Sequence, residues 1–134
     1  MTTMRNVLPV ALAPLESDVR PWGTWQVLDV APGYKVKRLT VRPGHRLSLQ
    51  RHTQRSEHWV VVSGEATCSV GPALQVAGVG ERVDVPRGAP HRLANDGTSA
   101  LVVIEVQIGD YLAEDDIVRI SDDYGRLTGP WLRA

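Results

Sequence analysis

Hydrophobic and polar positions alternate in short runs along most of this chain, and the runs are rich in β-branched residues. These runs span 24–28, 34–41, 57–62, 66–70, 73–77, 82–85, 91–94 and 100–107. Turn-forming sequences lie between them, among them Ala31-Pro32-Gly33, Ser63-Gly64, Gly71-Pro72 and Asn95-Asp96-Gly97. Strands of this length, separated by turns at this rhythm, predict an all-β sandwich or barrel.

Two segments depart from the alternation. Residues 1–19 show no strand period, so we expect an irregular N-terminal arm followed by a single domain over 20–134. In the segment 113–120, three acidic residues come early and Arg119 comes late. This order of charges suits a helix dipole, and it predicts one helical turn or at most one short C-terminal helix.

Composition narrows the class of protein. The chain has 134 residues, with 15 basic and 15 acidic side chains, which suits one domain and gives no reason to expect nucleic acid as a partner. The apolar run 7–13 is too short for a membrane span and is broken by Pro9, so a soluble, cytoplasmic protein is expected. The single cysteine, Cys68, excludes an internal disulfide and is expected to be a small core residue.

Four side chains could donate lone pairs to one metal ion. Gln50 and His52 are two residues apart, so on a strand they point to the same side. Glu57 shares a strand face with Trp59, where a carboxylate is costly unless a cation pairs with it. His91 opens a later strand. This set of nitrogen and oxygen donors suits one divalent ion, with zinc as the first choice and Mn, Fe, Co or Ni as alternatives.

The spacing of these residues resembles the two motifs of the cupin superfamily. The first motif is Gly44, five residues, Gln50-Arg51-His52, four residues, Glu57, six residues and Gly64. The second motif is Gly80, five residues, Pro86-Arg87-Gly88, two residues, His91, three residues and Asn95. The resemblance implies a double-stranded β-helix, that is, a cupin or jelly-roll barrel. It also implies that Gln50, His52, Glu57 and His91 are the metal ligands.

Gln50, where many cupins have histidine, narrows the resemblance to the type II mannose-6-phosphate isomerases. Arg20-Pro21-Trp22-Gly23 and Tyr124-Gly125-Arg126 are similar to that family too, and the similarity covers about residues 20–126. It implies a metal-dependent aldose–ketose isomerase of carbohydrate metabolism that converts mannose 6-phosphate to fructose 6-phosphate. Many members are longer and carry a nucleotidyltransferase domain before the cupin, which these 134 residues do not include.

Such an isomerase needs a base and a clamp for the sugar phosphate. Glu57 is the first carboxylate to consider as the base, but its basicity would be reduced if it is a metal ligand. Lys37 is the second candidate, because it shares a strand face with Leu39 and burial disfavours the charged form of a lysine. Arg55 and Arg126 are the candidate clamp, because the planar guanidinium binds phosphate through paired hydrogen bonds. The alternatives are a lysine that buries only its aliphatic stem and two solvated surface arginines.

Two other functions remain open on the sequence. A non-catalytic metal-containing cupin could bind a sugar or a sugar phosphate, and the same donor set would suit an iron-dependent oxygenase. A homodimer is expected as well, because the run 57–62 is apolar on both faces and would leave apolar sheet surface to cover.

Overall fold

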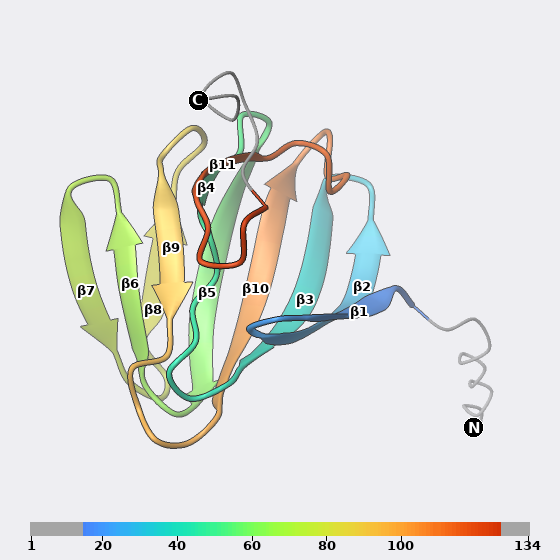
Figure 1. The fold of residues 1–134 in the computed structure, drawn as a ribbon. Coiled ribbons are helices and arrows are strands. Elements are labelled where there is room, and N and C mark those ends of the chain that lie inside the picture. Colours follow the sequence, from blue (N-terminus) through green and yellow to red (C-terminus); the bar gives the residue numbers. More distant parts are fainter. Residues whose placement is uncertain (1–14, 127–134) are drawn as a thin grey trace, which may run out of the picture.

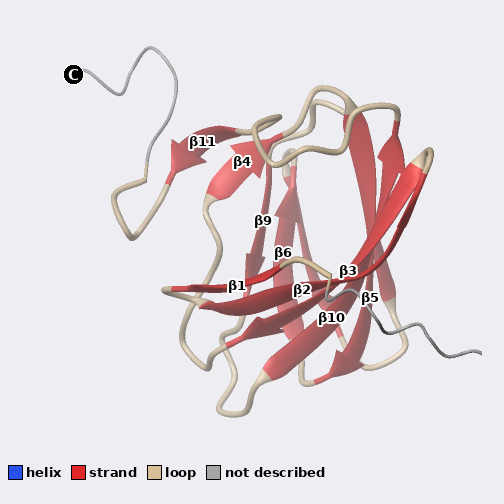
Figure 2. Cartoon of the chain, turned by 90° about the vertical axis from the view of Figure 1, so that its right-hand side faces the viewer, coloured by secondary structure: helices blue, strands red, loops and turns tan. Residues whose placement is uncertain are grey.

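The computed structural model describes residues 15–126, and these residues form two antiparallel sheets that face each other around one core (Figures 1 and 2). One sheet has six strands in the order β1-β2-β3-β10-β5-β8, and the other has five in the order β11-β4-β9-β6-β7. The strands are β1 Ser17–Arg20, β2 Gly23–Ala31, β3 Tyr34–Val41, β4 Leu49–Arg51, β5 Arg55–Ser63, β6 Ala66–Val70, β7 Ala73–Ala77, β8 Arg82–Val85, β9 His91–Ala94, β10 Leu101–Gly109 and β11 Val118–Ser121.

The prediction of an all-β double-stranded β-helix is confirmed, and every strand expected from the alternation is present. The predicted helical turn over 113–120 is wrong, because residues 114–116 form a non-helical turn and β11 follows. The proposed arm 1–19 lies mostly outside the described residues, and its last three residues belong to β1. Across residues 15–126, no helix is long and apolar enough to cross a membrane.

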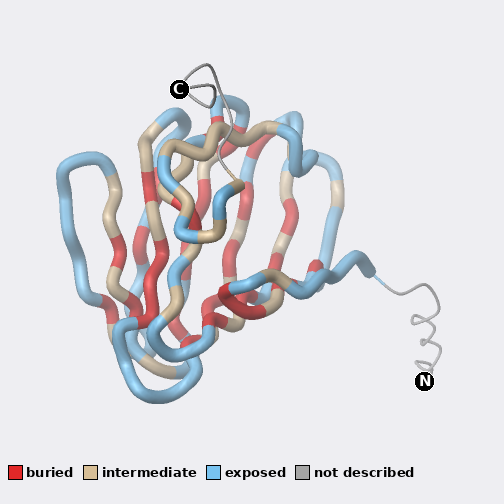
Figure 3. The backbone as a smooth tube through the Cα atoms, in the orientation of Figure 1, coloured by how far each residue is buried: buried red, intermediate tan, exposed pale blue. Residues whose placement is uncertain are grey.

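Buried and exposed residues alternate along the strands (Figure 3). Along neighbouring strands, the buried side chains change from apolar at one end to polar at the other. On β10, Leu101 and Val103 point inward at one end, and Glu105 and Gln107 point inward at the other. The register pairs Glu105 with Lys37 of β3, so β3 changes in the same direction. One end of the barrel is therefore a hydrophobic core, and the other end collects buried charges.

Candidate metal centre

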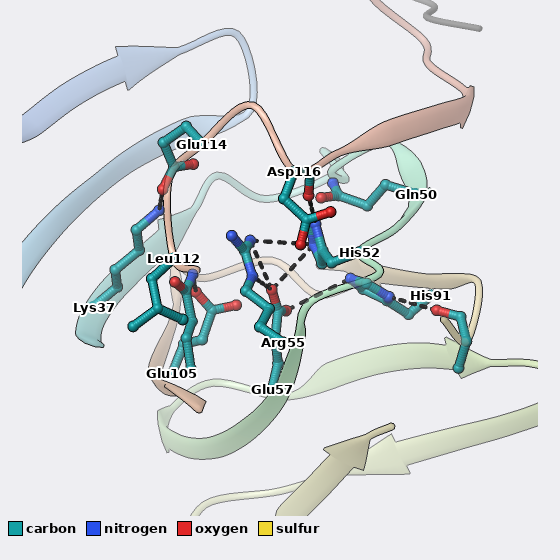
Figure 4. Close-up of polar contacts among 12 residues, drawn as sticks. Lys37, Gln50, His52, Arg55, Glu57, His91, Glu105, Leu112, Glu114 and Asp116 are labelled. Atoms are coloured by element: carbon teal, nitrogen blue, oxygen red, sulfur yellow. Dashed lines mark hydrogen bonds and ion pairs between the residues drawn. The ribbon is translucent and has the colours of Figure 1, made fainter. Parts of the chain in front are cut away.

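Three predicted ligands meet at the polar end of the barrel. Donor atoms of His52, Glu57 and His91 all lie within 4.8 Å of one another, and all three residues are buried. Glu57 comes from β5 of the larger sheet, whereas His52 follows β4 and His91 opens β9 of the smaller one (Figure 4). The two sheets therefore bring the two sequence motifs to one point.

Backbone carbonyls fix how the two imidazoles present themselves. His52 Nδ1 lies 2.6 Å from the carbonyl oxygen of Asp116, and His91 Nδ1 lies 2.9 Å from that of Ala89. A carbonyl oxygen only accepts, so each Nδ1 carries the proton and donates it. Both Nε2 atoms then face Glu57, at 3.0 Å from its Oε2 for His52 and 3.5 Å from its Oε1 for His91.

The two Nε2 lone pairs and the carboxylate oxygens of Glu57 are all acceptors. At these distances they require a cation or a shared proton between them. Burial acts to raise the pKa of Glu57, but His52, as a hydrogen-bond donor, and His91, as a positive charge, hold this pKa well below its usual range when their imidazoles are protonated. Glu57 is therefore a carboxylate at neutral pH. Two imidazole nitrogens and one carboxylate are a donor set that fits a divalent transition metal.

Gln50 lies beside this cluster in the same cavity (Figure 4). Its position follows from the pairing of Gln50 on β4 with His91 on β9. The amide nitrogen donates to the hydroxyl of Ser48 at 2.8 Å, so the amide oxygen is the atom that can serve a metal. Gln50 as the fourth ligand stays a prediction.

Arg55, a candidate for the phosphate clamp, is bound to the predicted metal ligands instead. Its Nε and Nη2 each lie 2.9 Å from Glu57 Oε2, and its Nη2 lies 3.2 Å from His52 Nε2. The side chain is buried. The guanidinium of Arg55 therefore neutralises the carboxylate of Glu57 in this structure.

Glu105 is a member of the site that the sequence interpretation missed. Trp59 Nε1 donates to its Oε2 at 3.0 Å, and Gln107 Nε2 donates to its Oε1 at 2.8 Å. Burial and the neighbouring charge of Glu57 raise the pKa of Glu105 to about 8. The sequence does contain a signal for Glu105. This residue follows Leu101 and Val103 at every second position of the strand, so it shares their face and is expected to point inward with them.

Lys37, the candidate base, is buried as expected but is paired. Its Nζ lies 2.7 Å from Glu114 Oε2 and 4.3 Å from the centre of the Trp25 ring. Nζ is therefore already engaged by Glu114 and by the Trp25 ring. A base needs a nitrogen that is free to approach the substrate, so these contacts oppose that role.

Arg126, the second clamp candidate, lines the cavity together with Arg20, Arg92 and Arg119, and Arg55 lines it as well. It is held by Asp122, whose Oδ2 lies 2.9 Å from Arg126 Nε. Burial and the positive charge of Arg126 lower the pKa of Arg119. The cavity therefore has a carboxylate–imidazole end and an arginine end.

Comparison with known proteins assigns the family. Residues 13–122 match the family described as mannose-6-phosphate isomerase C-terminal. The mannose-1-phosphate guanylyltransferase of Escherichia coli is 47% identical over 108 residues, which are 81% of this chain and 23% of that protein. The xanthan biosynthesis protein XanB of Xanthomonas campestris is 49% identical over 107 residues, 80% of this chain and 23% of that protein. The chain thus spans about a quarter of the length of these relatives.

Solved structures agree on the fold. A cupin-2 domain from Rhodospirillum rubrum superposes with a TM-score of 0.63 at 21% identity, over 76% of this chain and 78% of that one. The capsular polysaccharide assembling protein CapF of Staphylococcus aureus superposes with a TM-score of 0.69 at 22% identity, over 85% of this chain and 34% of that one.

The prediction of a mannose-6-phosphate isomerase is wrong. The relatives above share nearly half of their aligned residues with this chain, and their names refer to guanylyl transfer or to xanthan biosynthesis. The contacts of Lys37 and Arg55 give the physical reason, because the expected base is paired with Glu114 and one arm of the expected clamp is bound to Glu57. By its sequence and its double-stranded β-helix, the chain belongs to the mannose-6-phosphate isomerase C-terminal family of cupins.

Proposed function

We propose that this domain holds one divalent metal ion and binds a phosphorylated mannose compound of guanylyl transfer, either mannose 1-phosphate or guanosine diphosphate mannose. The observation that carries the proposal is that one cavity is lined both by Glu57 and His91 of the cluster and by Arg20, Arg92, Arg119 and Arg126. The hydroxyl oxygens of a sugar suit a metal ion at the cluster, and a phosphate group suits the arginines.

At the cluster end, His52, Glu57 and His91 would hold the ion, and Gln50 would complete the set. Zinc is the first choice for such donors, and the bound ion would supply a site for a sugar oxygen. The chain itself orients the donors, since the Asp116 and Ala89 carbonyls fix both imidazoles. Fixed donors lower the cost of ordering the site when the ion binds.

At the arginine end, Arg119 and Arg126 are the strongest candidates for the phosphate. Each guanidinium can give two parallel hydrogen bonds to phosphate oxygens. An anion there would relieve the repulsion between the two positive charges, which burial increases. Trp22 and Trp25 line the cavity as well, and their rings offer apolar surface to a sugar.

The sugar and the nucleotide are suggested by the relatives. One relative is named mannose-1-phosphate guanylyltransferase, and this chain matches about a quarter of it. A domain that binds the substrate or the product of that reaction would retain it near the transferase. This role requires binding and no chemistry on the sugar.

Calorimetric titration tests the proposal. We expect zinc-loaded protein to bind mannose 1-phosphate or guanosine diphosphate mannose at least about tenfold more tightly than mannose, which lacks the charged group. The double variant Arg119→Gln/Arg126→Gln should remove most of this preference, whereas Arg38→Gln, an outward residue that bonds Gln26, should keep it. Equal affinity for mannose and both phosphorylated compounds would show that the arginine end is not a phosphate site.

A further inference from the structure

The guanidinium of Arg55 lies among the atoms that a metal would use. It donates from Nε and Nη2 to Oε2 of Glu57 and from Nη2 to Nε2 of His52. The three residues are buried, so these contacts act at low dielectric, where charges interact strongly. An internal cation is therefore already bound to two of the three predicted metal ligands.

His52 makes this arrangement exclusive. A neutral imidazole has one lone pair in the plane of its ring, and the Nδ1 proton of His52 is committed to the carbonyl of Asp116. Its only lone pair, on Nε2, can accept the Arg55 proton or bind a metal, but it cannot do both. Two positive charges on the same side of Glu57 would also repel each other.

We propose that Arg55 is an internal competitor of the divalent ion for Glu57 and His52, and that metal binding releases its guanidinium into the cavity. This inference rests on the metal half of the proposed function. Within residues 15–126, Nη1 of Arg55 is buried with no hydrogen-bond partner, so one donor already awaits an acceptor. Arg55 also lines the cavity that contains the arginine end.

Two acidic side chains lie near Arg55 and could receive its guanidinium after a metal has released it. Glu105 and Glu114 line the same cavity, and both lie within electrostatic reach of Arg55. A guanidinium turned toward the ionised Glu114, which also pairs with Lys37, would keep part of its charge compensated and would offer its other N–H groups to an anionic ligand. The consequence is an order of events, in which the metal binds first and the phosphate compound gains a donor afterwards.

Metal affinity tests the competition. Zinc affinity would be measured by competition with a chromophoric chelator for the wild type, Arg55→Gln, Arg55→Lys and Arg38→Gln. Arg55→Gln removes the competing charge and is expected to bind zinc about 5- to 150-fold more tightly, the usual size of a coupling between two linked events. Arg55→Lys keeps a cation and should lie between Arg55→Gln and the wild type. Arg38→Gln, which removes an arginine outside the cavity that is hydrogen-bonded to Gln26, should match the wild type.

The outcomes separate the two proposals. If the wild type binds zinc and Arg55→Gln binds it equally or more weakly, the competition is wrong and the metal half of the proposed function stands. If neither protein binds a divalent ion, both proposals are wrong. Zinc binding by Arg55→Gln alone would support the competition in its strongest form.

A measurement on the wild type guards against a variant that fails to fold. The Nε–H resonance of Arg55, assigned by its loss in Arg55→Lys, reports its hydrogen bond to Glu57. Stoichiometric zinc is expected to shift this resonance and to speed its exchange with water. A resonance that stays unchanged while zinc binds would overturn the inference.

Discussion

At the scale of single residues, the site is organised around the carboxylate of Glu57. Arg55 and His52 contact one of its oxygens, and His91 approaches the other. Glu105 lies next to it as a second buried carboxyl group, whose raised pKa keeps it protonated near neutral pH. Removing the charge of Glu57 therefore affects both the metal site and the stability of the domain.

The change Glu57→Gln is expected to abolish stoichiometric metal binding, because a neutral amide is a weak ligand. It also leaves the buried Arg55 without its counter-ion, which should cost about 3–5 kcal/mol of the free energy of unfolding. Elemental analysis and urea denaturation measure the two effects, with the exposed Glu65→Gln as the control. Unchanged metal content in Glu57→Gln would show that the predicted ligand set is wrong.

Cys68 provides a pH-dependent prediction away from the site. Burial raises the pKa of its thiol to about 11, from an ordinary value of 9.0. An acid whose pKa is raised in the folded state stabilises that state below pH 9, and the contribution is lost as the pH rises toward 11. At pH 8 a thiol reagent should react with the urea-unfolded chain and hardly with the folded one, and equal rates would contradict this burial.

Individual residues of the site were partly predictable. Glu57 was identified because a charge on an otherwise apolar strand face needs a partner, and Glu105 satisfies the same criterion on β10. The contact between His52 and the Asp116 carbonyl was not predictable, since it joins loops 64 residues apart. Periodicity shows which way a side chain points, but it does not show which loop meets it.

At the scale of elements, the segment 110–117 connects the two ends of the cavity. Its Leu112 carbonyl accepts a hydrogen bond from Lys35, and its Glu114 pairs with Lys37. The carboxylate of Asp116 accepts hydrogen bonds from Thr53 and from the backbone of Gln54. These contacts explain why the acidic residues form a turn here in place of the predicted helix.

The change Asp116→Ala is expected to weaken metal binding about 10- to 100-fold, because it frees the loop that follows His52. The fold should persist, since no strand pair is broken. Zinc competition measures the loss, and Asp115→Ala is the matched control because Asp115 lies on the same turn, is exposed and accepts a hydrogen bond from Tyr111. Equal losses in the two variants would assign the effect to the turn as a whole.

A glycine sets the approach of β10 to the start of β5. A Cβ atom on Gly109 would lie 2.3 Å from the carbonyl oxygen of Gln54, which is backbone and cannot turn aside. Gly109→Ala should therefore cost about 1–3 kcal/mol of the free energy of unfolding, as overpacking does. Thermal denaturation checks this, with Gly78→Ala as the control, because its Cβ would meet only a side-chain atom of Glu81 at 3.7 Å.

The strands were more predictable than the segments between them. Long alternating runs defined β3 and β5 well, because each has one face in the core. β1 and β11 are four residues long and carry little burial, so no period could reveal them. Their positions depend on pairing with β2 and β4, which is a property of the sheets.

At the scale of the whole molecule, the outer face of the larger sheet carries exposed apolar residues. Val60 and Val62 of β5 and Ile108 of β10 are among them, and β5 and β10 are paired neighbours. The homodimer expected from the sequence stays a prediction, and this face is where we expect it. Sedimentation velocity should show a dimer that Val60→Lys/Val62→Lys converts to monomer, with Leu74→Lys on β7 as the control. A monomeric wild type at micromolar concentration would exclude it.

The turn that holds Asp116 also determines how fast a bound metal ion can leave the site. It supports His52 through hydrogen bonds that involve no strand pair, so it can open while both sheets stay intact. Loop motions of this kind take nanoseconds to microseconds, and local openings take microseconds to seconds. A bound ion should therefore leave at the pace of local opening, and a strong chelator should remove it from the folded protein far faster than the domain unfolds.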